Sequence, residues 1–315
     1  MKTVHLYSGG LDSTIVLYIL KEWGAKVYPL HVTHKFLSIK HLPEIPGLKT
    51  VDATEEFIEI VKSPQHGYGK NFNPCIDCRI LMLKKAKEYM VEQKADFVTT
   101  GEVLDQRPMS QRLDTMMRIE REAGLEGLVV RPLSGVLLPT TIPEQKGIID
   151  RDKMLKLKGR SRKFELAFAA KNDIKEFFSP SGGCLLTDPG FSRRLADAMR
   201  YQEDMDETAI ERLKIGRHFR IAPDAKLIVG RNEDENKKLE ELAGPFFFLY
   251  VPDTGSPNTI LEGNKKYLKL AAAVTARYCD RNQEKDITVL YRQKKKTGKI
   301  VVSPISNDEL AQWRI

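Results

Sequence analysis

The sequence has few cysteines, no long apolar segment and no repeat, and its first glycine turn lacks the lysine of a Walker loop. No stretch approaches the roughly 20 apolar residues of a membrane-spanning helix, and Met1 to Tyr7 is too short for a signal peptide. We therefore expect a cytoplasmic protein that does not contact a membrane. Four cysteines in 315 residues do not form a disulfide framework. Clustered thiols in a reducing compartment instead suggest metal or redox chemistry.

Length and composition allow two folded domains. Apolar residues make up 41% of the chain and charged residues 30%, which is ordinary for a globular protein. The net charge of +8 is compatible with a polyanionic partner. We place a catalytic domain at residues 1–188, a helical connector at 189–212 and a smaller α+β domain at 213–315.

The first half alternates predicted strands and helices. Strands are expected at Lys2–Tyr7, Ala25–Val32, Ala95–Thr100 and Leu128–Arg131, and helices at Thr14–Trp23, Ala53–Val61 and Cys78–Gln93. This alternation predicts an α/β fold with a parallel twisted sheet and helices on both faces. Ligands of such sheets bind at the carboxyl ends of the strands. The loop at Ser8, the residues after Val32 and Gly101 all lie at such ends.

The second half predicts a different pattern. Residues 150–171 read as basic and helical, and Ser179 to Gly183 break the chain before Cys184. A helix is expected from Asp188. Beyond Leu213 the sequence predicts strands at His218–Ile221, Lys226–Val229, Phe246–Val251, Asp286–Arg292 and Lys299–Val302, with helices at Arg231–Leu242 and Gly263–Tyr278.

The segment Ser8-Gly9-Gly10-Leu11-Asp12-Ser13 connects the first strand to the first helix. Glycines let backbone amides approach an anion, and the helix N-terminus adds positive partial charge. A carboxylate at Asp12 would repel phosphate unless it holds Mg²⁺ that bridges to the phosphates. An Asp N-cap after a tight turn is the simpler alternative.

These six residues resemble the PP-loop of the ATP pyrophosphatases, which have an adenine nucleotide α-hydrolase-like fold and release pyrophosphate from ATP. The resemblance implies an ATP site, with Asp12 as the catalytic magnesium ligand. The residues expected to bind ATP are Ser8, Gly9, Gly10, Leu11, Asp12, Ser13, His31 and Gly101. His34 is expected on the surface.

Three cysteines form the second candidate site. Cys75 and Cys78 are three positions apart, and Cys184 follows a pair of glycines. A helix that starts near Cys78 would depress the pKa of that thiol. The three could bind a [4Fe–4S] cluster with one open iron. Alternatively, Cys78 and Cys184 could be a persulfide pair, or the thiols could bind zinc with a fourth ligand. Cys279 is expected to be a small buried side chain.

Together the motifs resemble the iron–sulfur-dependent tRNA thiouridine synthetases. Asn73-Pro74-Cys75-x-x-Cys78 is similar to the family's first cysteine block, and Cys184 corresponds to its distal catalytic cysteine. The segments 100–102 and 106–111 resemble its nucleotide site. The resemblance implies that Asp12, Cys78 and Cys184 are catalytic and that ATP, Mg²⁺ and a [4Fe–4S] cluster are used. A tRNA uridine would become 4-thiouridine or 2-thiouridine, with sulfur from sulfide or a donor such as a cysteine desulfurase. A cysteine rather than an aspartate at position 75 favours the cluster.

Basic residues mark two further regions. The C-terminal domain resembles the RNA-binding domain of the NFACT family, carried by Ile228 to Asn232 and the helix around Ala271. Its basic hairpin is expected to contact RNA phosphates; a solvated turn is the alternative. These residues are Arg292, Lys294, Lys295, Lys296 and Lys299. In the stretch from Lys153 to Lys163, either Lys153 or Arg160 could offset charge on pyrophosphate, or the stretch could be a solvated helix face.

Two other functions are compatible with the motifs. A PP-loop can activate a small molecule for amidation, which would need neither tRNA nor three cysteines. An RNA-binding or iron–sulfur sensor with a vestigial loop is the second, although the intact Asp12 and Ser13 argue against it. A homodimer is also allowed by the sequence.

Overall fold

The computed structural model describes residues 1–38, 42–177, 183–201 and 205–315. The break predicted from Ser179 onward therefore lies outside the described residues up to position 182. The chain divides into two compact units, Met1–Thr187 and Asp188–Ile315, which are described separately. None of the helices in these ranges has the length and apolar character needed to cross a bilayer.

The first unit contains a five-stranded parallel sheet, which confirms the predicted α/β fold. Its strand order is β3-β2-β1-β4-β5. The strands are β1 (Lys2–Leu6), β2 (Lys26–Thr33), β3 (Lys49–Asp52), β4 (Phe97–Thr100) and β5 (Val129–Val130). The sequence did not predict β3, which is a short edge strand paired only with β2. The carboxyl ends of β1 and β4 lie side by side, since Leu6 is in register with Thr100.

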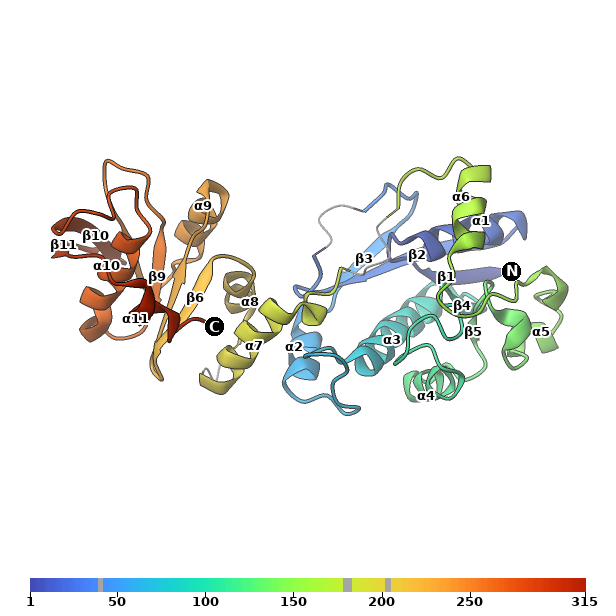
Figure 1. The fold of residues 1–315 in the computed structure, drawn as a ribbon. Coiled ribbons are helices and arrows are strands. Elements are labelled where there is room, and N and C mark those ends of the chain that lie inside the picture. Colours follow the sequence, from blue (N-terminus) through green and yellow to red (C-terminus); the bar gives the residue numbers. More distant parts are fainter. Residues whose placement is uncertain (39–41, 178–182, 202–204) are drawn as a thin grey trace. The chain divides into compact units, whose positions relative to one another are not determined.

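Helices cover both faces of this sheet (Figure 1). One face packs α3 and α4 through a core that includes Val4, Leu83 and Ile119. The other face packs α1 and α6 through a core that includes Ile15 and Ala169. The helices of this unit are α1 (Leu11–Glu22), α2 (Thr54–Lys62), α3 (Cys75–Gln93), α4 (Leu113–Ala123), α5 (Ile142–Gln145) and α6 (Lys163–Lys171), with short 3₁₀ turns at Gly135–Leu137, Arg151–Lys153 and Leu185–Thr187.

Three sequence-based boundaries in this unit are wrong. The first helix begins at Leu11 rather than Thr14, which places Asp12 in its first turn. The third begins at Cys75 rather than Cys78, because the amide of Cys78 already donates to the Pro74 carbonyl at 2.9 Å. The stretch 150–171 is not one continuous helix, because residues 155 and 157 donate backbone hydrogen bonds to residues 132 and 133.

The second unit is built on a six-stranded antiparallel sheet of order β11-β10-β8-β9-β7-β6. Helix α10 packs on one face in the larger core, where Cys279 is buried, and α9 packs on the other. The strands are β6 (Arg217–Ala222), β7 (Ala225–Val229), β8 (Phe247–Tyr250), β9 (Thr259–Glu262), β10 (Ile287–Gln293) and β11 (Lys296–Val302). The helices are α7 (Pro189–Tyr201), α8 (Glu207–Lys214), α9 (Glu233–Leu242), α10 (Leu268–Arg277) and α11 (Asn307–Ala311), with a 3₁₀ turn at Lys265–Tyr267. The predicted connector, residues 189–212, groups with this unit.

A fully buried histidine ties β1 and β4 to the start of α1. The Nε2 of His5 lies 2.9 Å from the Ser13 carbonyl, and its Nδ1 lies 3.0 Å from the Thr99 hydroxyl. A carbonyl only accepts, so Nε2 carries the proton and the Thr99 hydroxyl donates to Nδ1. Burial lowers the pKa of His5 to about 4, so the ring stays neutral at physiological pH.

The His5 ring predicts acid sensitivity. Its pKa is about 6.5 unfolded and about 4 folded, so the unfolded chain binds the extra proton between these values. The contribution of neutral His5 to the free energy of unfolding is therefore complete above pH 6.5. It falls by about 3 kcal/mol as the pH drops from 6.5 to 4. His5→Gln, which keeps a donor to Ser13, should lose less stability over this range in urea unfolding at pH 7 and pH 4.5. An identical loss in both proteins would contradict the assignment.

Candidate nucleotide and thiol site

The first strand ends in a glycine loop that leads directly into α1. Gly9 has a φ of 73°, which residues with a side chain rarely adopt. The Ser8 and Ser13 hydroxyls lie 3.1 Å apart, and the Ser13 hydroxyl donates to the Gly10 carbonyl at 2.8 Å. No side chain caps the helix at Gly10, so the amides of the first turn, starting at Leu11, are available to an anion.

Asp12 pairs with an arginine from the basic stretch before α6. Its Oδ1 accepts from Nη2 of Arg162 at 2.9 Å. Burial raises the pKa of Asp12, against the opposing effects of Arg162, Gln106 and Arg107. The two expected candidates from this stretch, Lys153 and Arg160, are exposed side chains. In the described part of this stretch, the ion pair with the loop is made by Arg162, which the sequence analysis did not single out.

Two buried polar atoms beside Asp12 lack hydrogen-bond partners among the described residues. They are Nε of Arg162 and Oε1 of Glu165. Glu165 is 1% exposed, and its pKa is raised mainly by burial and further by the charge of Asp12. Unpaired buried donors and acceptors are costly and call for an explanation. A phosphate oxygen would satisfy Arg162, and a cation would satisfy Glu165. This donor set fits Mg²⁺ bound by one or two carboxylates together with phosphates.

The other residues expected to bind ATP surround the same loop. Gly101 lies so close that a Cβ added to it would sit 2.6 Å from the Ser13 nitrogen. His31 is buried, and its Nδ1 donates to the Tyr7 carbonyl at 2.9 Å, so it supports the loop from β2. His34 is only 4% exposed and stacks on Phe57 at a centroid distance of 3.8 Å. The expectation of a surface position for His34 is therefore wrong.

Two chain segments hold the cysteines. Cys75 and Cys78 occupy the first turn of α3, where residues three apart face the same side. Cys184 lies in a short strand-like segment. The amide of Ser38 donates to the Gly183 carbonyl at 2.7 Å, and that of Leu185 donates to the Phe36 carbonyl at 2.9 Å. The residues that follow β2 therefore position the distal cysteine, which the sequence did not reveal.

The three thiols are mutual electrostatic neighbours. Repulsion from Cys184 and from Cys75 raises the pKa of Cys78, and repulsion from Cys75 raises the pKa of Cys184. Burial is the largest effect at each, raising the pKa of Cys75 and Cys78 and that of Cys184 to about 11. The expected depression at Cys78 is wrong, because loss of solvent outweighs the nearby positive charges. A bound metal would be needed to hold these groups as thiolates near neutral pH.

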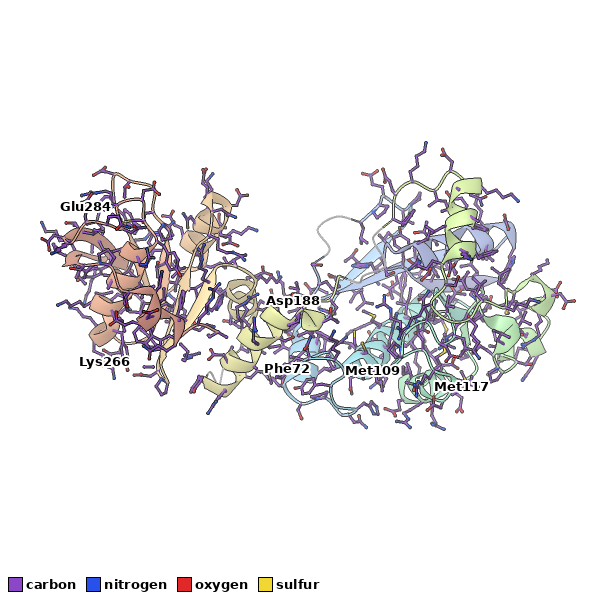
Figure 2. All side chains as sticks on the ribbon, in the orientation of Figure 1. Phe72, Met109, Met117, Asp188, Lys266 and Glu284 are labelled. Carbon is purple, nitrogen blue, oxygen red and sulfur yellow. The ribbon has the colours of Figure 1, made fainter. Side chains whose placement is uncertain are left out.

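Arg107 links the nucleotide loop to the thiols. Its charge interacts with Cys75 and Asp12, and also with Arg79 and Arg162. Partial loss of solvent around the guanidinium, followed by repulsion from Arg79, lowers the pKa of Arg107, although the residue is exposed overall. The segment that carries Arg107 packs on the loop before α3, where the side chain of Met109 (labelled in Figure 2) fills the space over Gly69. The glycine loop and the cysteines thus share the electrostatic environment of Arg107 in the first unit.

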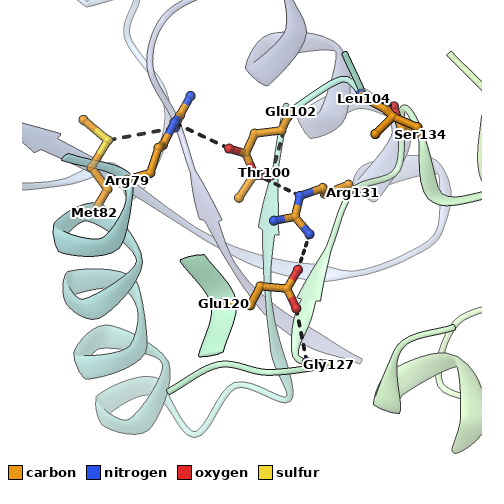
Figure 3. A network of polar contacts seen from close by, with 9 residues as sticks. All are labelled: Arg79, Met82, Thr100, Glu102, Leu104, Glu120, Gly127, Arg131 and Ser134. Atoms are coloured by element: carbon orange, nitrogen blue, oxygen red, sulfur yellow. Dashed lines mark hydrogen bonds and ion pairs between the residues drawn. The ribbon is translucent and has the colours of Figure 1, made fainter. Parts of the chain in front are cut away.

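A buried ion network extends from Arg79 across the sheet (Figure 3). Glu102 lies 3.5 Å from Nε of Arg79 and 2.9 Å from Nε of Arg131, which also pairs with Glu120. Burial opposes ionisation of Glu102, but Arg131 and Arg79 outweigh it and lower its pKa. Removing one partner from such a network typically costs about 3–5 kcal/mol. The network fixes Arg79, one residue after Cys78.

The donor set bears on which metal group could bind. Across the described ranges, no three His, Cys, Asp or Glu side chains are grouped as ligands of a single ion. A lone Zn²⁺ therefore finds no preformed tetrahedral set here.

Two known families match the chain, and each match lies within one of the two structural units. Residues 1–139 match the family described as thiamine biosynthesis protein (ThiI), and residues 216–314 match the NFACT protein RNA binding domain. The chain joins a ThiI-family domain to an NFACT-type RNA-binding domain. The ThiI match includes Asp12, Cys75 and Cys78 but ends before Arg162 and Cys184.

The curated relatives share the name "Probable tRNA sulfurtransferase". The protein of Thermococcus kodakarensis is 25% identical over 183 residues, covering 55% of this chain and 44% of the relative. That of Metamycoplasma arthritidis is 19% identical over 219 residues, covering 68% and 54%. The chain spans about half the length of these relatives. Among solved structures, the C-terminal part of the fibronectin/fibrinogen-binding protein from Streptococcus suis covers 83% of this chain and 97% of its own at 11% identity, with a TM-score of only 0.29.

The basic hairpin expected to bind RNA lies in the NFACT-type domain. Lys294 and Lys295 form its two-residue turn, with a φ of 55° at Lys294. Lys294, Lys295, Lys296 and Lys299 are exposed. Arg292 is paired with Glu240 at 2.7 Å, so its charge is partly offset, and the lysines carry most of the positive field.

A separate cavity of about 220 Å³ lies in the ThiI-family unit beside α4, β5 and α5, with Met117 and Glu144 in its lining. No residue predicted to bind ATP or metal lines it. The cavity borders the ion network through Glu120 and Arg131 but contains none of the loop or cysteine residues.

Gly101 gives a test of the loop geometry. A Cβ at this position would meet the backbone of Asp12 and Ser13 at under 3 Å, and this backbone cannot move without displacing the first turn of α1. Gly101→Ala should destabilise the protein by about 1–3 kcal/mol and weaken ATP binding, measured by calorimetry. Gly147→Ala is a useful comparison, because Gly147 has positive φ but open space around it. Undiminished ATP binding by Gly101→Ala would contradict this close approach.

Proposed function

We propose that the chain is an ATP-dependent tRNA sulfurtransferase that replaces a uridine carbonyl oxygen with sulfur. The observation that carries the proposal is the position of Arg107, whose charge interacts with both Asp12 and Cys75. A nucleotide-binding loop and a set of thiols that share one region suit two consecutive reactions on one base. The family matches and the names of the relatives support the same assignment.

The first step activates the base. The uridine carbonyl oxygen attacks the α-phosphorus of ATP, the bond to the bridging oxygen of the β-phosphate breaks, and pyrophosphate leaves with that electron pair. The amides at the start of α1 are suited to stabilise the phosphate charge, and Arg162 is positioned beside them. Asp12 and Glu165 would hold the Mg²⁺ that accompanies ATP. The oxygen of the base becomes part of AMP, which is a good leaving group.

The second step introduces sulfur. A sulfur nucleophile attacks the same carbon, the carbon–oxygen bond breaks, and AMP departs with the oxygen. Cys75, Cys78 and Cys184 would hold a [4Fe–4S] cluster, which when bound supplies an open iron as a carrier of sulfide. Arg79 and Arg107 place positive charge beside these thiols and so favour an anionic sulfur there. The product is 4-thiouridine or 2-thiouridine.

Cys184 provides the decisive variant. Cys184→Ala should abolish thiolation of tRNA while ATP binding persists, because the residue lies with the thiols and not in the loop. Thionucleoside content after incubation with tRNA, ATP and sulfide measures this. Cys279→Ala is the matched control, since Cys279 is buried in the core of the other unit. Full thiolation by Cys184→Ala would refute the proposed role.

Anaerobic purification separates the two ways of carrying sulfur. A brown protein with about four irons and matching sulfide per chain supports the cluster. A colourless protein with an extra sulfur atom on Cys184 by mass spectrometry supports a persulfide instead, with Cys78 as the resolving thiol. The electrostatic interaction between Cys78 and Cys184 is compatible with this second outcome.

Arg162 tests the activation step. Arg162→Gln should reduce tRNA-dependent exchange of pyrophosphate into ATP by about a hundred- to a thousandfold, the usual effect of removing one group that stabilises developing charge. Arg160→Gln removes a neighbouring but exposed arginine and should leave exchange near normal. Equal effects of the two changes would contradict the role of Arg162. Exchange without any tRNA dependence would favour amidation of a small molecule.

A further inference from the structure

One face of the C-terminal sheet presents two rows of side chains across adjacent strands β8, β10 and β11. Leu290 is in register with Tyr250 on one side and Lys299 on the other, and Arg292 is in register with Phe248 and Thr297. Side chains two residues apart on a strand face the same way. Both rows therefore lie on the same face of the sheet.

Helix α9 covers only part of this face. Leu239 and Leu242 pack against Phe248 and Ile260, and Glu240 at the helix edge pairs with Arg292. Beyond the helix the surface is open, and Val301 is 52% exposed. The covered part is therefore core, and the part over β10 and β11 is accessible surface.

The accessible part is a groove of about 360 Å³, whose lining includes Tyr250, Leu290, Arg292 and Lys299. The groove combines an aromatic and apolar floor with basic edges. The Arg292 guanidinium lies 4.6 Å from the centre of the Phe248 ring, and the hairpin lysines follow directly along the chain. Because Glu240 neutralises much of the charge of Arg292, Lys299 and the hairpin lysines are the residues available to bind phosphate.

This combination is characteristic of surfaces that bind single-stranded nucleic acid. Every base has a flat face that stacks on an aromatic ring, and lysines at the edge contact the backbone phosphates. A duplex hides the faces of its bases and could use only the lysines. An acidic peptide would also be drawn to the lysines but would gain nothing specific from the Tyr250 ring.

We propose that this groove binds an unpaired segment of RNA, with one base stacked on Tyr250 and Leu290 and a neighbouring phosphate at Lys299. That this RNA is a tRNA rests on the proposed function. The inference adds that the domain binds single-stranded nucleotides, such as those of a loop or an end. It assigns a stacking role to Tyr250, which the basic hairpin alone does not imply.

The test uses the full chain and two probes, a short single-stranded RNA carrying one 2-aminopurine and a blunt RNA duplex of equal length. The single strand should bind more tightly than the duplex, and its fluorescence should be quenched by stacking. Tyr250→Leu keeps an apolar side chain but removes the ring, and should weaken single-strand binding by about ten- to a hundredfold and abolish quenching. Tyr250→Phe should retain both. Lys299→Gln should reduce the slope of log affinity against log salt by about one.

Tyr18→Leu is the matched control, because Tyr18 is an exposed tyrosine of the other unit, at 38%. Unchanged affinity and quenching in Tyr250→Leu, or equal binding of the duplex, would overturn the proposal. Loss of binding in Tyr250→Phe as well would also overturn it, since that variant preserves stacking. RNA binding is measured separately from thiolation, so a chain that binds single strands through Tyr250 but never thiolates tRNA would contradict only the proposed function.

Discussion

The positive charge of Arg107 makes the interactions on which the candidate site depends. It interacts electrostatically with Asp12 and Cys75, which favour its charged form, and with Arg79 and Arg162, which oppose it. The neighbouring arginines repel the charge of Arg107, and partial loss of solvent adds to the cost. Anionic groups in the same region offset that cost. The site is thus arranged for negative charge, which both phosphate and sulfur anions carry.

The parallel sheet explains why distant residues meet in this region. The loop after β1, Gly101 after β4 and the residues after β2 all lie at the carboxyl ends of neighbouring strands. The residues after β2 then pair with those around Cys184, and α3 begins with the other two cysteines. The ion network through Glu102 and Arg131 joins the ends of β4 and β5 to Arg79. The carboxyl ends of the strands in a single sheet therefore position both the nucleotide loop and the cysteines.

The two units contribute different kinds of recognition. The ThiI-family unit supplies buried, partly unsatisfied polar groups, which suit a small charged ligand. The NFACT-type unit supplies an open sheet face with an aromatic floor and exposed lysines, which suits a flexible polyanion. Long-range attraction by the lysines is sensitive to salt and indifferent to sequence, whereas a stacked base requires an unpaired nucleotide. These two kinds of recognition are what the proposed function requires, since one unit would bind a large RNA and the other would bind the reacting small ligand.

The sequence by itself determined the features that depend on local patterns. The strand, glycine loop and helix around Asp12, the parallel class of the first sheet and the paired cysteines after Pro74 all follow from neighbouring residues. Edge strands such as β3 were missed because four residues carry little periodic signal and owe their conformation to a partner strand. Only the tertiary structure decided that Arg162 reaches Asp12, that Leu37 pairs with Cys184 and that the thiol pKa values rise. Burial and charge at a residue are set by atoms distant in the chain, and no local pattern records where those atoms will lie.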